Sequence, residues 1–276
     1  MTGRLLFAAT AFAAVAIAAI LGFLVWFSLP VFESGALRST LAWNWRPLQG
    51  EFGILPMLAG SLGLSRSALA LAFPMAVGLC GFAHGIGPAC MARPLLATIR
   101  FMTGIPTVVY GLASMFLLVP LVREASHGSG FCWLAAALTL SLLVLPTIAL
   151  LIDSQFRQAR ACIGLTAAAL GFAPAQQLMR LTLPLSVRGL AMAASLGFGR
   201  AVGDTLLPLM LAGNAAQIPA SPFESIRTLT AHIALVVSTD SQSAAYNSLF
   251  LAGLILFMTS VMVNLGLRQL RSTAHA

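Results

Sequence analysis

The stretch GRAVGDT, residues 199–205, places an arginine and an aspartate four positions apart inside an apolar run. Residues four apart lie on one face of a helix, so Arg200 and Asp204 can approach each other or both face a partner helix. An arginine near the centre of a bilayer costs about 2.5–3.5 kcal/mol on insertion scales. Such residues are rare, and they usually line a pathway or pair with another group.

Two hypotheses follow for this pair. In the first, Arg200 and Asp204 form a structural ion pair that fixes helix packing. In the second, they lie on a substrate pathway, because a guanidinium can bind a tetrahedral oxyanion through two hydrogen bonds. Asp204 would then hold Arg200 and weaken its field, so that an anion binds only transiently. Arg66, in LGLSRSALALAFP, either snorkels to the membrane interface or lies on the same path.

Other polar side chains near the apolar runs give weaker signals. His84, in GFAHGIGP, fits a packing or interfacial histidine better than a proton relay, and Asp153 is expected to be solvated at the inner end of a span. No C-x-x-C or H-E-x-x-H pattern occurs, so no metal site and no catalytic residue are predicted. We expect the four cysteines to be small packing residues; they are Cys80, Cys90, Cys132 and Cys162.

The composition identifies the elements that must hold these side chains. The chain has 276 residues, of which 59% are hydrophobic and 8% charged, whereas soluble domains carry about 25% charged residues. A soluble fold of this composition would expose apolar surface and aggregate. Long apolar runs instead predict an all-α membrane protein with six transmembrane helices. The expected spans are 5–28, 57–86, 95–122, 131–152, 187–213 and 245–267.

The chain is divided into two parts on this basis. Residues 1–56 are expected to hold the first transmembrane helix and an outer segment, and residues 57–270 the main transmembrane domain. The first apolar run is longer than the roughly 7–15 residues of a signal-peptide core, so we expect it to be retained as a helix.

The arginines predict the orientation. There are 15 basic residues, all arginine, against seven acidic ones. With the N-terminus inside, nine arginines fall in inner segments and four in outer ones, which predicts that both termini are cytoplasmic. The arginines form no basic block, so no nucleic acid partner is expected. Without lysine the chain cannot form a phosphate-binding P-loop, so no cofactor is expected and any ATP must be bound by a partner subunit.

Residues 154–186 connect the fourth and fifth expected spans. The alanine-rich first half favours helix, Gly171 can end that helix, and Pro184 precedes the next span. The pattern predicts a short helix–turn–helix at the cytoplasmic face, which by itself is equally an ordinary surface loop.

The same segment resembles the EAA loop of ABC transporter permeases, whose pattern is E-A-A-x-x-x-G, nine residues, then I-x-L-P. Leu165 stands where that family usually has glutamate, and Thr166 replaces the first alanine. The resemblance implies a coupling helix that docks on an ATPase subunit, with part of the polar docking lost. The coupling residues carried over are Leu165, Thr166, Ala167, Gly171, Leu181, Leu183 and Pro184.

A narrower resemblance covers most of residues 55–270. IPTVVYGL followed by LVPLV, GRAVGDT, LAGNAAQIP followed by SIRTLTAHIA, and NSLFLAGLILFMTSVMVNL are similar, in order, to stretches of PstC/PstA-like phosphate ABC permeases. This implies a type I importer permease of MetI-like architecture in the bacterial inner membrane. It further implies ABC ATPase subunits, a second permease subunit and an extracytoplasmic phosphate-binding protein, received by outer segments that include 33–53 and 214–244.

Three alternatives remain open from the residues alone. Sulfate, molybdate and phosphonate permeases share the EAA architecture, so another oxyanion is possible. A proton-coupled secondary transporter would use His84, Asp153 or Asp204, but the inverted repeats and several intramembrane acids typical of that class are not found. A membrane-embedded enzyme is weaker still, because no nucleophile motif occurs.

Overall fold

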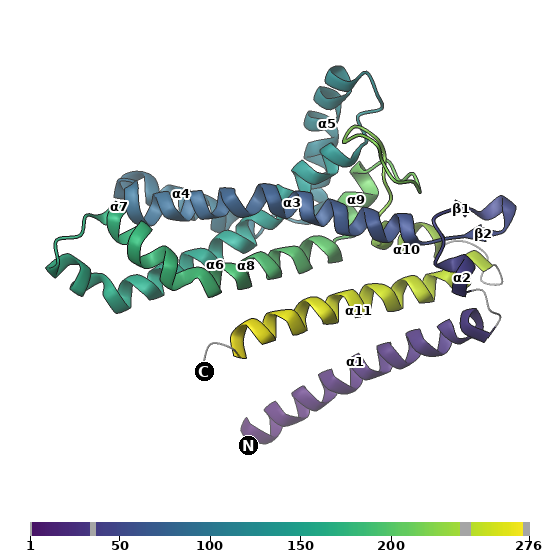
Figure 1. Ribbon diagram of the computed structural model, residues 1–276, viewed down its shortest axis with the longest axis horizontal. Coiled ribbons are helices and arrows are strands. Elements are labelled where there is room, and N and C mark those ends of the chain that lie inside the picture. The colour runs from purple at the N-terminus through teal and green to yellow at the C-terminus, as the bar shows by residue number, and fades with distance from the viewer. Residues whose placement is uncertain (1, 34–36, 238–243, 273–276) are drawn as a thin grey trace.

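The computed structural model describes residues 2–33, 37–237 and 244–272. Within these ranges the fold is helical apart from one small hairpin (Figure 1), in agreement with the predicted all-α membrane class. Among the described residues, five helices are long and apolar enough to cross a membrane, and the apolar stretch Ser248–Met262 lies in a further helix. The five are Gly3–Leu29, Leu55–Ile86, Thr107–Ser126, Trp133–Ala169 and Pro174–Gly203.

Two helices form the centre of the bundle, α3 (Leu55–Gly81) and α6 (Trp133–Ala169). Small side chains let helices approach closely in a membrane, and α3 carries a stripe of mostly small residues at four-residue spacing. The buried stripe is Leu64, Ala68, Ala72, Ala76 and Cys80. Trp133 fixes the start of α6 on α3, because its Nε1 donates a hydrogen bond to Ser67 Oγ at 2.8 Å.

The fifth expected span, 187–213, is two helices rather than one. α8 (Leu183–Gly203) packs along α6, and α9 (Leu206–Leu211) follows after a break at Asp204. Asp204 has extended backbone angles, φ −74° and ψ 129°, which a helix cannot accommodate.

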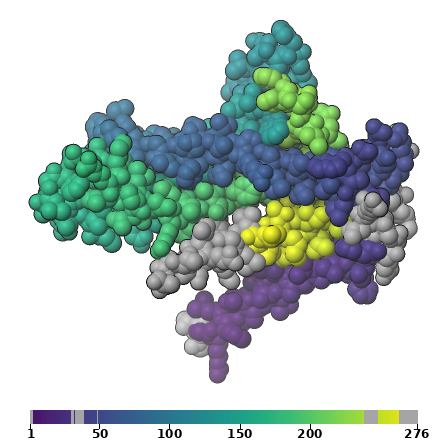
Figure 2. Space-filling view, in the orientation of Figure 1, coloured from purple at the N-terminus to yellow at the C-terminus, as the bar shows by residue number. Residues whose placement is uncertain are grey.

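The third expected span, 95–122, is also divided. α4 (Ala89–Met102) lies along the bundle, whereas α5 (Thr107–Ser126) projects from it as an arm (Figures 1 and 2). Pro106 explains the break, because a proline disfavours helical backbone in the residue before it and donates no hydrogen bond. The arm exposes large apolar side chains, including Phe116 at 74%.

At the edge of the bundle α1 (Thr2–Glu33) lies beside α11 (Ala244–Ser272) (Figure 1). The ring of Phe250 stacks on Phe27 at 4.9 Å between centroids and meets Phe23 edge-on at 5.8 Å. Most of the apolar side chains of α1 are exposed on this chain, as expected for a helix that faces lipid.

The predicted outer segments contain short elements. Residues 34–36 of segment 33–53 and residues 238–243 of segment 214–244 lie outside the described part of the chain. The first segment holds α2 (Leu37–Thr40), the antiparallel strands β1 (Trp45–Arg46) and β2 (Glu51–Phe52), and the 3-10 turn η1 (Pro47–Gln49) between them. The second holds α10 (Leu229–Val236). The hairpin lies at one end of the molecule, opposite the turn after α6 (Figure 1).

Candidate functional site

The GRAVGDT stretch lies at the break between α8 and α9. Arg200 is in the last turn of α8, whereas Asp204 lies beyond the helix end. The Asp204 carboxylate accepts a hydrogen bond at 3.0 Å from the backbone N–H of Leu207 in α9. The prediction that Arg200 and Asp204 share one helix face is therefore wrong, because the helix ends between them. No ion pair within 4.0 Å joins these two residues in the described part of the chain.

Arg200 is exposed on the surface of this chain and lies close enough to Tyr110 and Asp204 for electrostatic interaction. A cation in the last turn of a helix is favoured by the helix dipole. Tyr110 belongs to the VVYG stretch of α5, and its hydroxyl donates to the Met102 carbonyl oxygen at 3.0 Å. Two motifs that are far apart in the sequence therefore meet beside the α8–α9 break.

A third motif, SIRTLTAHIA, reaches the same place. The Thr230 hydroxyl donates to the backbone carbonyl of Asp204 at 3.0 Å. Thr228 caps α10, because its hydroxyl accepts from the N–H of Ala231 at 3.2 Å. Arg227 Nε donates to the Asn214 carbonyl at 2.8 Å. The sequence shows these motifs only in order along the chain, so their convergence is a finding of the structure.

Arg66 stands apart from this convergence. It is exposed on α3, and no hydrogen bond or ion pair joins it to Arg200 or Asp204 in the described residues. Its place on a substrate pathway stays a prediction.

The first half of segment 154–186 is not a separate helix. α6 continues without a break from Trp133 to Ala169, so the expected helix–turn–helix is an extension of a membrane span followed by a turn. The turn has two hydrogen bonds, from Gly171 N–H to the Ala168 carbonyl and from Phe172 N–H to the Ala167 carbonyl, both at 3.0 Å. This is a Schellman motif with Gly171 at φ +75°, which confirms that Gly171 ends the helix.

The returning half of the segment consists of two short pieces and the start of the next long helix. α7 (Pro174–Gln177) and the π-helical turn η3 (Leu178–Thr182) lead directly into α8. The carried-over coupling residues divide by exposure. Leu165 is 90% exposed and Thr166 is exposed, whereas Ala167 is 1% exposed and packs inward. Gly171 and Pro184 are exposed, and Leu181 and Leu183 are half-buried. The turn thus presents an apolar tip on a packed base.

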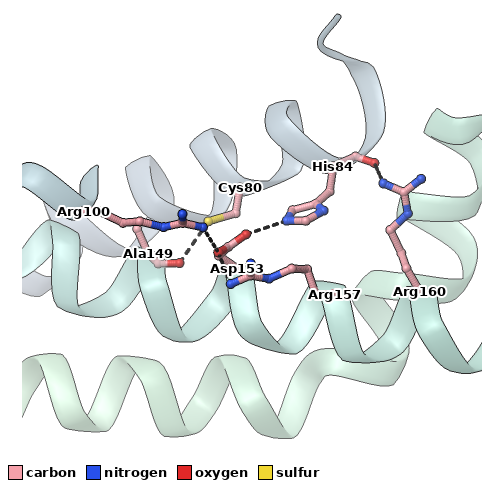
Figure 3. Close-up of polar contacts among 7 residues, drawn as sticks. All are labelled: Cys80, His84, Arg100, Ala149, Asp153, Arg157 and Arg160. Carbon is pink, nitrogen blue, oxygen red and sulfur yellow. Dashed lines mark hydrogen bonds and ion pairs between the residues drawn. The ribbon is translucent and has the colours of Figure 1, made fainter. Parts of the chain in front are cut away.

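A polar cluster that the sequence did not predict lies where α3, α4 and α6 meet (Figure 3). The expectation that Asp153 is solvated is wrong, because its side chain is 0% exposed. His84 Nε2 lies 2.7 Å from one carboxylate oxygen, Arg157 Nη2 lies 2.6 Å from the other, and Arg100 Nη2 lies 3.9 Å from that second oxygen. His84 belongs to a second π-helical turn, η2 (Phe82–Ile86), at the end of α3.

The buried carboxylate of Asp153 requires the charged partners that surround it. A buried carboxylate must be paired and hydrogen-bonded, since an isolated buried charge is very costly. Arg160 also ties α6 to η2, because its Nη1 donates to the His84 carbonyl at 2.8 Å. The four-residue spacing of Asp153 and Arg157 was a visible signal for a helix ion pair. No local pattern could have shown that His84 pairs with Asp153, which is 69 residues away.

His232, outside the membrane-spanning segments, is a further buried polar residue. Its ring packs edge-on against Trp45 of the hairpin at 4.4 Å between centroids. The side chain is fully buried, and neither ring nitrogen has a hydrogen-bond partner in the described residues. Burial, with a smaller contribution from the charge of Arg227, lowers the pKa of His232 to about 4. The imidazole is therefore neutral at physiological pH.

The comparison with known structures identifies the fold. A chain of the MetNI methionine ABC transporter superposes with a TM-score of 0.62 and 15% identity, over 79% of this chain and 95% of that chain. A chain of a bacterial alginate ABC transporter superposes with a TM-score of 0.57 and 14% identity, over 92% of each. The predicted type I, MetI-like permease fold is thereby confirmed, although the described residues contain five helices long enough to span a membrane rather than the expected six.

Sequence relatives identify the family. A probable ABC transporter permease, YqgH of Bacillus subtilis, is 31% identical over 233 residues, which are 83% of this chain and 75% of the relative. The phosphate transport system permease protein PstC of Pasteurella multocida is 27% identical over 240 residues, which are 80% and 75% of the two chains. No protein-family model matches. This multi-pass membrane protein belongs to the family of ABC transporter permeases that includes YqgH and PstC.

Proposed function

We propose that this chain is one permease subunit of an ATP-driven importer of inorganic phosphate. The observation that carries the proposal is the convergence of three motifs at the α8–α9 break. There Arg200 lies near Tyr110 and Asp204, and Thr230 is bonded to the backbone of Asp204. The substrate class comes from the PstC relatives, which are named as phosphate transport permeases.

Arg200 supplies the positive charge that a phosphate ion needs in a region of low dielectric constant. Its guanidinium matches two oxygens of a tetrahedral oxyanion. Because no ion pair among the described residues holds Arg200, the guanidinium is available to the anion. Asp204 does not bind Arg200 directly, but its carboxylate fixes the start of α9 and leaves a negative charge close by. That charge keeps phosphate binding weak enough for release.

Energy for transport comes from separate ATPase subunits, since this chain has no lysine and hence no P-loop. We assign docking on the ATPase to the exposed tip around Leu165 and Thr166. A second permease chain completes the pathway, because Arg200 is on the surface of this one. A phosphate-binding protein is received at the hairpin end.

The turn at Gly171 faces the cytoplasm in this proposal, together with both termini. Arginine counts support this orientation. So does the arrangement in Figure 1, where α1 begins and α11 ends toward the same side of the molecule as the turn. The membrane is then the bacterial inner membrane.

Uptake of labelled phosphate by cells that carry Arg200→Gln tests the proposal. A charge-assisted hydrogen bond is worth about 1.5–3 kcal/mol, so we expect the rate to fall about 10-fold to 100-fold. Asp204→Asn keeps an acceptor for the Leu207 N–H and changes only the charge, so its effect isolates electrostatics from capping.

The matched controls are Arg123→Gln, an exposed arginine in α5, and Glu124→Gln, an exposed acid in the same helix. Membrane abundance is measured for every variant. Normal uptake by both Arg200→Gln and Asp204→Asn would remove these residues from the pathway. Competition by excess arsenate but not by sulfate or molybdate is expected, and the reverse result would assign a different oxyanion.

A further inference from the structure

The turn that follows α6 is physically connected to the buried Asp153 cluster. Leu178 of η3 packs against Gly85 of η2, the residue after His84. A Cβ atom on Gly85 would lie 2.5 Å from Leu178 Cδ2 and 2.8 Å from Leu178 Cβ, so the contact has no slack. A movement of η3 would therefore displace η2 at Gly85, and with it the neighbouring His84.

Both sides of this contact are π-helical turns, each of five residues. A π-helical turn contains one more residue than the regular helix needs, and such turns are frequent at functional sites. Conversion of η2 to regular helix would rotate His84 about the helix axis. η2 and η3, which meet at Gly85 and Leu178, can thus rotate their side chains about the helix axis by converting between π-helix and α-helix, and are not limited to tilting.

There is also room for such a change. A cavity of about 450 Å³ lies beside η2, and its lining includes every residue from Ala83 to Gly87, with Arg93 of α4. Packed interiors resist movement because neighbouring atoms must shift as well. η2 has the cavity on one side. On its opposite side, His84 is bonded to Asp153.

Asp153 already has a second cation within reach. Arg100 on α4 points at the carboxylate oxygen that Arg157 contacts, at 3.9 Å (Figure 3). The Arg100 side chain is 55% exposed, so its long arm can move without leaving a cavity. Arg157 stays with Asp153 in any arrangement, because both are on α6 four residues apart. If the carboxylate loses His84, Arg100 can therefore replace it. A state with neither is disfavoured, because the buried carboxylate would keep only Arg157 as a partner.

We propose that Asp153 is a positioning residue for energy coupling: its buried carboxylate exchanges His84 of α3 for Arg100 of α4 when the turn after α6 is moved. The exchange releases the end of α3 and holds α4 instead, so that movement at the ATPase contact reaches the membrane helices as one of two discrete arrangements. This inference rests on the coupling role proposed above for the segment around Leu165.

Two native cysteines allow a direct test. Cys90 at the start of α4 and Cys162 near the end of α6 are exposed, whereas Cys80 and Cys132 are buried. Spin labels on Cys90 and Cys162 report the distance between α4 and α6 by pulsed electron resonance. The measurement uses the complete transporter, purified with its ATPase and reconstituted in lipid, without nucleotide and with ATP.

In the wild type, ATP is expected to shift the distance distribution. His84→Ala should populate the ATP-like distance without nucleotide, and Arg100→Gln should oppose the shift. Each should change the ratio of the two populations by at least about fivefold, the lower end of typical coupling between sites. His84→Gln keeps a donor and should restore the wild-type ratio. Asp153→Asn should abolish the response to ATP, and Glu124→Gln, in α5, should leave it unchanged.

The outcomes separate the two proposals. If ATP shifts the wild-type distances but His84→Ala and Arg100→Gln match the wild type, the partner exchange is refuted while coupling stands. If ATP produces no shift in the wild type although the complex hydrolyses ATP, the coupling role of the turn is itself refuted. The His84 and Arg100 variants keep the test decisive even if Asp153→Asn does not fold. ATP hydrolysed per phosphate transported should rise in Asp153→Asn, a change that a purely structural ion pair would not cause.

Discussion

Replacing Gly197 by alanine tests how closely α8 must approach α6. A Cβ atom at position 197 would lie 2.5 Å from Cδ1 and 2.6 Å from Cγ1 of Ile148, and 3.2 Å from Val144 Cγ1. Ile148 is completely buried, so its side chain cannot move aside freely. Overpacking of this kind costs about 1–3 kcal/mol. Alanine also gains about 1 kcal/mol over glycine inside a helix, which partly hides that cost.

Gly199 supplies the matched control, because it lies in the same helix and, apart from its chain neighbours and the adjacent helix backbone, no atom of the described residues comes within 4 Å of a Cβ placed there. Gly199→Ala gains the helix propensity without the clash. The two variants should therefore differ by about 2 kcal/mol, which corresponds to about 4–8 °C in the unfolding temperature of a chain of this size. Thermal unfolding of the purified chain in detergent, followed by circular dichroism, measures the difference. Equal unfolding temperatures would show that the α6–α8 contact is not as tight as described.

Three further predictions concern other parts of the chain. The pKa of His232 is about 4 in the folded chain, against 6.5 when unfolded, so the unfolded state binds more protons between these values. The buried imidazole should thus remove about 3 kcal/mol of stability as the pH falls from 6.5 to 4 and have no effect above 6.5; unfolding temperatures of His232→Gln and wild type across this range check it, and parallel curves would contradict it. Gly213 has φ +77° and a Cβ there would clash with Ser225 and lie 2.7 Å from the Phe131 carbonyl oxygen, so Gly213→Ala should destabilise by at least about 2 kcal/mol. Gly50→Ala has a similar φ of +75° but open space, and should lose only the backbone part; similar losses in both would refute the steric account. Because Leu165 is 90% exposed, Leu165→Asp should change stability by less than about 0.5 kcal/mol yet reduce co-purification of the ATPase, and retention of the ATPase would argue against docking at this tip.

The membrane class and the helix content could be predicted from the sequence because they depend on composition and run length. Apolar runs of the right length between arginines need no tertiary information. The helix breaks inside two of the apolar runs could also be predicted from the sequence. Pro106 and the Gly203–Asp204 pair are ordinary helix-ending residues. Each lies inside an apolar run long enough to span a bilayer, and the length of the run favours one continuous span over two helices.

The candidate site was predictable in its residues but not in its geometry. Arg200 and Asp204 stand out because charges are rare in this chain. Whether they pair depends on where α8 ends, and the cap that Asp204 gives to α9 decides that. Taken alone, His84 and Asp153 each have an ordinary explanation in the sequence, as an interfacial histidine and a solvated acid. Their contact depends on how α3 crosses α6, which is set by the stripe of small residues along α3 and not by any local pattern.

The pairing of α1 with α11 has a consequence for biogenesis. α11, the main neighbour of α1 among the described helices, follows all the others in the chain and is therefore synthesised after them. Until α11 has been synthesised, α1 lies in the bilayer without this neighbour. Its direction of insertion is then determined by flanking charge such as Arg4 rather than by packing. Truncation before α11 should leave α1 correctly inserted but free to diffuse away from the bundle.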